Sequence, residues 1–198
     1  MDRDEIRLIE RVQDGDSAAF KEFVEKYQRR LFQFALELTG DWDDAEDISQ
    51  QVFIKAYRGL VRFKGKAKVM SWLFRIAINT HIDEDRRRKS RGGWAVRSED
   101  EDETQREPFV ATAAEDNPER QTAAGQMGAH IQAALGTLAP QQRLVFILRH
   151  YHDLPLKEIA GILGVTLGTV KSQLFRAIRH LQKQLAFYRP ELGLEESQ

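Results

Sequence analysis

The feature that most constrains the fold is a break in composition between residues 92 and 128. This stretch holds 3 basic and 9 acidic residues, a Gly-Gly pair and two prolines, and it has no sustained apolar period. Such a segment buries too little apolar surface to fold by itself and is typical of a mobile linker. We therefore expect two small folded parts, residues 1–91 and 129–190, joined by a flexible acidic linker at 92–128 and followed by a tail at 191–198.

The first part is predicted to be a helical bundle. Apolar residues between positions 20 and 38 recur at intervals of three and four, as on one face of a helix, and Gly40 ends the pattern. Asp43 or Asp44 can cap the helix that follows. The three expected helices cover about 20–39, 44–60 and 68–88.

The second part is also predicted to be helical. Pro140 opens a helix that ends near Tyr151, and Pro155 opens a short one that Gly164 ends. Thr166 is a good N-cap for the long helix after it. Since no segment alternates apolar and polar residues over more than four positions, we expect an all-α protein.

Composition excludes several kinds of chemistry. The chain has no cysteine, so it can form no disulfide, thiolate nucleophile or cysteine-ligated metal site. That usage suits a reducing cytoplasm, which is the expected location. The charged N-terminus does not resemble a signal peptide, and no run approaches the roughly 20 apolar residues of a membrane span. We expect no membrane insertion and no cofactor.

The helix at 44–60 carries an apolar residue on its polar side. A helical projection gathers Ala45, Ile48, Val52 and Ala56 on one stripe that can pack inward. Ile54 lies on the opposite side, among Asp47 and polar neighbours. A lone exposed apolar residue is usually unremarkable, but one that acidic and amide side chains surround can also anchor a partner protein. The projection leaves both interpretations open.

Residues 55–91 form the basic part of the chain, with 12 basic and 3 acidic side chains against a total net charge of −1. Aromatic residues are interleaved with the charges, a pattern that favours nucleic acid because cations neutralise phosphates and flat rings stack on bases. Trp72 and Phe74 could instead belong to the core, with the arginine run as a solvated helix end. Trp72, Ile76, Asn79 and Asp83 follow one helical course, and the basic loop at 62–68 together with the buriable polar Asn79 favours nucleic-acid contact.

Residues 156–181 have the spacing of a helix-turn-helix, in which the second helix reads the major groove. Ile159, Ala160 and Leu163 are expected to bury the first helix. The inner stripe of the second helix is Val170, Leu174, Ala177, Ile178 and Leu181. Its outer face carries side chains suited to base edges and phosphates. An ordinary helical hairpin is the alternative.

Together these segments resemble an extracytoplasmic-function (ECF) sigma factor of bacterial RNA polymerase, in the sigma-70 superfamily. The resemblance rests on DAEDISQQVFIKAYRGL at 44–60, FKGKAKVMSWLFRIAINTHIDEDRRR at 63–88, and the stretch from Leu138 to Gln182 that contains the helix-turn-helix. They occur in the family's order on either side of a linker. The resemblance implies a sigma-2 domain, a sigma-4 domain, and a specificity subunit with no catalytic site of its own.

The resemblance also implies partners and contact residues. The expected partner is core RNA polymerase, through its β′ clamp helices and its β subunit. The helix at 44–60 would dock on the β′ clamp helices through Asp44, Asp47, Gln50, Gln51, Phe53 and Ile54. The −10 DNA contacts would be Phe63, Lys64, Lys66, Lys68, Trp72, Arg75, Asn79, Arg86, Arg87 and Arg88, with Phe63 and Asn79 at the pocket for a flipped base. The −35 contacts would be Thr169, Lys171, Ser172, Gln173, Phe175, Arg176 and Arg179. An anti-sigma factor is a further expected partner.

Some positions depart from the family's pattern. Gln51 stands where the family usually has Glu, and Lys66 and Val69 are unusual in their loop. Gln173 and Phe175 replace residues frequent in the −35 reader, so the promoter sequence cannot be copied from relatives. Two other classes of protein account for less of the chain. A stand-alone helix-turn-helix regulator leaves the basic aromatic segment without a role, and a metal enzyme built on His150, His152 and Asp153 lacks a third convergent ligand.

Overall fold

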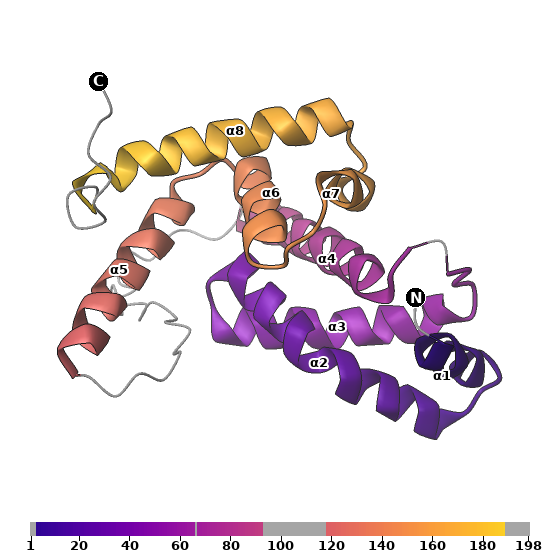
Figure 1. Ribbon diagram of the computed structural model, residues 1–198. Helices are drawn as coiled ribbons and strands as arrows, with labels where there is room; N and C mark the ends of the chain where they lie inside the picture. Colours follow the sequence, from indigo (N-terminus) through magenta and orange to yellow (C-terminus); the bar gives the residue numbers. More distant parts are fainter. Residues whose placement is uncertain (1–2, 66, 93–117, 189–198) are drawn as a thin grey trace. The chain divides into compact units, whose positions relative to one another are not determined.

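The chain folds into two helical units. The computed structural model describes residues 3–65, 67–92 and 118–188, and within them it has eight α-helices, one short 3₁₀ turn and no strand (Figure 1). The chain divides into Met1–Asp102 and Glu103–Gln198. The predicted all-α class is therefore confirmed. Among the described residues, no helix is both long enough and apolar enough to cross a membrane.

The first unit contains α1 (Arg3–Gln13), α2 (Ser17–Thr39), α3 (Trp42–Leu60) and α4 (Val69–Gly92). Helices α2, α3 and α4 pack against one another, and α1 lies against α2 and α3. The Phe34 and Phe74 rings meet in the core with centroids 4.2 Å apart. The largest fully buried side chains here are Phe23, Leu31, Phe34, Ile48, Val52, Leu60, Leu73 and Phe74.

Helix ends in this unit follow the sequence signals with one correction. Gly40 closes α2 in the left-handed region at φ 71°, where glycine has no steric penalty. The N-cap of α3 is Asp41, not Asp43 or Asp44: its backbone is extended and its carboxylate accepts from the Asp44 N–H at 3.0 Å. Asp43 and Asp44 lie inside the first turn, where their negative charge interacts favourably with the positive end of the helix dipole.

The second unit contains α5 (Pro118–Gly136), α6 (Pro140–His150), α7 (Leu156–Leu163), α8 (Leu167–Gln184) and the 3₁₀ turn η1 (Ala186–Tyr188). Residues 118–128, expected in the linker, are helical and belong to α5. Helix-forming Ala, Glu, Gln and Arg after an initial proline explain this without any apolar period. The acidic run at 99–103 and the tail at 191–198 lie outside the described residues.

The core of the second unit is built on α8, which packs against α5, α6 and α7. Val170, Ala177 and Leu181 of its predicted inner stripe are buried, while Leu174 and Ile178 are half-buried. In α7, Ile159 and Ala160 are buried as predicted, whereas Leu163 is half-buried and Ile162, which was not predicted, is buried.

Candidate functional site

The outer face of α3 is polar except for Ile54. Asp47 and Gln50 are exposed, and 56% of the Ile54 surface is accessible. Phe53 is half-buried at the edge of this face. An isoleucine this exposed makes little contribution to the domain's own core, so its apolar surface is available to a partner.

A groove of about 470 Å³ runs between α2 and α3 beside this face. Phe32, Gln50 and Phe53 are among its lining residues. Trp42, which is 59% exposed, and Phe32 make a T-shaped ring contact with centroids 4.7 Å apart. Trp42 was not among the predicted site residues.

The loop after α3 brings an aromatic pair together. The Phe63 and Trp72 rings lie with centroids 5.0 Å apart, and Gly65 turns the loop at φ 65°. The Phe63 N–H donates to the Leu60 carbonyl at 2.9 Å, and the Gln13 amide of α1 donates to the Leu60 and Phe63 carbonyls at 2.9 and 3.0 Å. Gln13 is a loop-positioning residue that the sequence analysis did not identify.

Helix α4 separates its aromatic and polar residues. Phe74 is fully buried, so the core interpretation holds for it, whereas Trp72 is half-buried beside the loop. Arg75 and Asn79 are exposed on the helix. The remaining predicted cations are exposed as well, namely Lys64, Lys68, Arg86, Arg87 and Arg88, while Lys66 lies outside the described residues.

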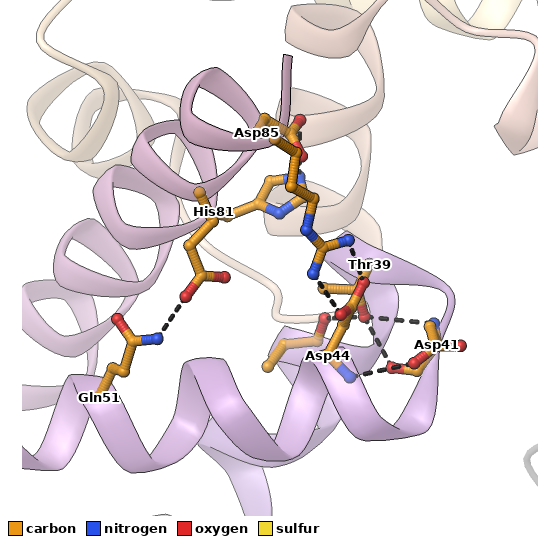
Figure 2. A network of polar contacts seen from close by, with 9 residues as sticks. Thr39, Asp41, Asp44, Gln51, His81 and Asp85 are labelled. Atoms are coloured by element: carbon orange, nitrogen blue, oxygen red, sulfur yellow. Dashed lines mark hydrogen bonds and ion pairs between the residues drawn. The ribbon is translucent and has the colours of Figure 1, made fainter. Parts of the chain in front are cut away.

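Polar contacts join α3 to α4, as Figure 2 shows around Asp44 and Gln51. Arg88 is bidentate on Asp44: its Nη1 donates to Oδ2 at 2.8 Å and its Nη2 donates to Oδ1. This hydrogen-bonded carboxylate raises the pKa of Arg88. The Gln51 amide donates to the Glu84 carboxylate. Asp44, Gln51 and Arg88, all expected to contact other molecules, thus have partners inside the domain.

Helix α8 has a capped N-terminus and an exposed outer face. Thr166 accepts from the Thr169 N–H at 3.1 Å, as predicted for the N-cap, and Gly164 adopts φ 67° in the turn. The exposed side chains on its outer face are Lys171, Ser172, Phe175, Arg176 and Arg179, with Thr169 and Gln173 half-buried.

Two contacts organise side chains along α8. The Arg179 guanidinium lies over the Phe175 ring, 5.1 Å from its centroid, in cation–π geometry. His180 is half-buried and hydrogen-bonds through Nε2 to Thr137 Oγ1 at 2.8 Å. This contact ties α8 to the residues that follow α5.

The histidines near the end of α6 do not converge. His152 is buried, whereas His150 is largely exposed at the end of the helix, and partial desolvation of its ring together with the neighbouring Arg149 lowers its pKa. Within residues 3–65, 67–92 and 118–188, no group of three or more His, Cys, Asp or Glu side chains is arranged to hold a metal ion.

Comparison with known families matches both units. Residues 23–91 match the family model described as Sigma-70 region 2, and residues 129–181 match the one described as Sigma-70, region 4. The first range contains α3, the loop and α4, and the second contains the helix-turn-helix. These matches define a protein of the sigma-70 class.

Full-length relatives refine the class. The RNA polymerase sigma-H factor of Pseudomonas aeruginosa is 34% identical over 182 residues, which cover 90% of this chain and 92% of the relative. The ECF RNA polymerase sigma factor SigW of Bacillus subtilis is 33% identical over 182 residues, covering 90% and 95%. The chain belongs to the ECF sigma factors of RNA polymerase, as its motifs indicated.

Solved structures share the fold. The sigma factor RpoE of Bartonella quintana, crystallised with the anti-sigma factor NepR, is 25% identical with a TM-score of 0.63, covering 84% of this chain and 96% of that one. CnrH, in complex with the cytosolic domain of CnrY, is 23% identical with a TM-score of 0.64, covering 90% and 95%.

Proposed function

We propose that this sigma factor binds core RNA polymerase through α3, recognises the −10 and −35 elements of its promoters, and opens the DNA. The observation that carries the proposal is that one sigma-factor chain has two exposed surfaces of different character. One is the Ile54 face of α3, and the other is the basic outer face of α8, each opposite a buried apolar stripe.

Polymerase docking is assigned to the outer face of α3. Asp47 and Gln50 offer a carboxylate and an amide to a basic partner, and Ile54 and Phe53 offer apolar surface beside them. Interfaces of this kind concentrate their energy in a few apolar anchors that a polar rim surrounds. The β′ clamp helices are the expected partner, in keeping with the family.

Promoter opening is assigned to the loop and the exposed side of α4. Phe63 and Trp72 form an aromatic wall, and Asn79 supplies an amide able to hydrogen-bond a base edge. Capture of an extruded base costs about a few kcal/mol in lost stacking, which contacts in a pocket offset. Arg75, Lys64 and Lys68 supply charge for the backbone phosphates, and Arg86 and Arg87 extend that charge.

Recognition of the −35 element is assigned to α8. Arg176 is suited to guanine, Gln173 to adenine, and Phe175 to the methyl group of thymine. Lys171, Ser172 and Arg179 are placed to contact phosphates or base edges, and Thr169 lies near the groove entrance at the N-terminus.

An anti-sigma factor is proposed as a regulatory partner. Support comes from the Bartonella RpoE structure, which was determined with the anti-sigma factor NepR. Such a partner would act by covering the polymerase-binding face of α3.

In vitro transcription tests the proposal as a whole. The purified protein is added to core RNA polymerase with supercoiled bacterial DNA, and transcripts are mapped. We expect new transcripts with discrete start sites. A protein that binds duplex DNA by itself but leaves the transcripts of the core unchanged would instead be a stand-alone regulator.

Single substitutions test the separate surfaces. Ile54→Asp is expected to weaken core binding by about 30-fold, the effect of losing one apolar anchor, whereas Ile6→Asp, at an exposed site on α1, serves as the matched control. Asn79→Ala should slow promoter opening more than closed-complex formation. Arg176→Ala should relax discrimination at one −35 position by about 1–3 kcal/mol.

A further inference from the structure

Helices α3 and α4 run antiparallel with a row of polar contacts between them. Each contact joins one flank of α3 to side chains four residues apart on α4, at positions 80, 84 and 88. The pairs are Asp44 with Arg88, Gln51 with Glu84, and Lys55 with Thr80, the last at 2.8 Å from Nζ to Oγ1. We call these six residues the α3–α4 seam.

The seam accounts for a glutamine at position 51. Its amide nitrogen is the donor for the Glu84 carboxylate, and both side chains are half-buried. A glutamate at position 51 would place two acceptors against each other. Like charges at this distance repel and leave both carboxylates without a donor. The residue at 51 is therefore matched to the residue at 84.

At the arginine end of the seam, two residues predicted to contact other molecules, Asp44 and Arg88, bind each other instead. Arg88 and Asp44 meet fork to fork, the geometry that gives charge-assisted pairs their strength and direction. While this pair holds, the Arg88 guanidinium has its parallel donors on a carboxylate rather than on a phosphate. Arg86 and Arg87 are exposed on the same turn and free of this constraint.

We propose that Asp44, Gln51 and Arg88 are positioning residues that fix α4 on α3, rather than direct contacts to polymerase or DNA. This inference rests on the proposed function, because it assigns α3 to docking and α4 to opening. The seam sets the offset between the Ile54 face and Asn79. Docking of α3 on polymerase thereby determines where the base-capturing side of α4 lies.

A reciprocal exchange tests the Gln51 pair. Gln51→Glu should slow open-complex formation by about five- to tenfold, the size of coupling within one hydrogen-bond network, while core affinity changes less than twofold. Adding Glu84→Gln to it restores a donor and an acceptor with their positions exchanged, and should restore the opening rate. Gln50→Glu is the matched control on the outer face: its effect falls on core affinity, and Glu84→Gln does not reverse it.

The measurements are permanganate reactivity of −10 thymines for opening and equilibrium binding of the full chain to core polymerase for docking. A Gln51→Glu protein that loses core affinity, with no recovery in the double variant, would overturn the proposal and make Gln51 a polymerase contact. If the wild-type protein fails to program the core at all, the proposed function fails instead. Urea unfolding of the free wild type, Gln51→Glu, Glu84→Gln and the double variant then tests the Gln51–Glu84 pair. Non-additive changes in the free energy of unfolding support the pair, and additive changes overturn it.

Salt dependence tests the arginine end. Arg88→Gln should leave the slope of log affinity against log salt for promoter DNA unchanged, because Arg88 neutralises Asp44 and not a phosphate. Arg87→Gln, one residue away, should reduce that slope by about one. An equal reduction in both variants would place Arg88 on the DNA and refute this part of the seam.

Discussion

Gly59 on α3 offers the sharpest test of how closely α3 and α4 approach each other. A Cβ at this position would lie 2.8 Å from Trp72 Cζ2 and 3.4 Å from Cη2. Since carbon contacts are most favourable near about 3.5–4.0 Å, Gly59→Ala must displace the indole or open the α3–α4 pair. The displaced ring is the one that packs on Phe63, at 5.0 Å.

Two opposing effects set the magnitude. Overpacking typically costs about 1–3 kcal/mol, while alanine in place of a helical glycine favours the folded state by about 0.5–1 kcal/mol. The net expectation is a loss of about 1 kcal/mol in the free energy of unfolding of the first unit. Because the strain falls on Trp72 and Phe63, promoter opening should suffer more than stability alone implies.

Urea unfolding followed by tryptophan fluorescence isolates this unit, because all three tryptophans precede residue 103. Gly161→Ala on α7 is the matched control: a methyl group at this position would meet no heavy atom within 4 Å, so the variant should gain about 0.5–1 kcal/mol by far-UV circular dichroism. If Gly59→Ala also gains stability and opens promoters at the wild-type rate, the close approach of α3 to Trp72 is wrong.

Substitutions at three further positions probe a helix end and two titrating groups. Thr166→Ala should destabilise the second unit by about 1 kcal/mol in thermal unfolding, and Thr166→Asn, which can still cap, should not. Hydrogen bonds from the Ala19 N–H and from Arg11 lower the pKa of Asp16. The charged carboxylate therefore stabilises the fold above the ordinary aspartate pKa of about 4, and this contribution is lost as pH falls through the lower folded-state pKa. Asp16→Asn should reduce the acid destabilisation below about pH 4, measured by tryptophan fluorescence. Burial and Glu5 raise the pKa of Tyr27, so its stabilisation is complete below the ordinary value of about 10 and declines above it; Tyr27→Phe should remove that alkaline decline.

Local signals in the sequence predicted much of the fold. Gly40, Pro155, Gly164 and Thr166 mark helix ends because each acts through its own backbone or its nearest turn. Apolar periodicity placed α2, α3 and α8 for the same reason. Asp41 was missed because three acidic residues compete for one cap, and only backbone conformation separates them.

Other features depend on contacts between segments distant in sequence, which no local pattern carries. Helix α1 is rich in charge, and its burial of Leu8 and Ile9 against the bundle becomes evident only in three dimensions. The same limit applies to the site. Exposure of Ile54 followed from a projection of one helix, whereas the pairing of Arg88 with Asp44 spans 44 residues.

The Gln13 amide gives α1 a consequence beyond its own packing. It donates hydrogen bonds to the carbonyls of Leu60 and Phe63, which lie 47 and 50 residues further along the chain. The region-2 match begins only at residue 23. A protein trimmed to that boundary would retain every predicted promoter contact of the first unit, but it would lose Gln13 and its hydrogen bonds to the loop. We therefore expect an N-terminal truncation to disturb the loop to which we assign base capture, so that the promoter affinity of such a fragment would be lower than that of the intact chain.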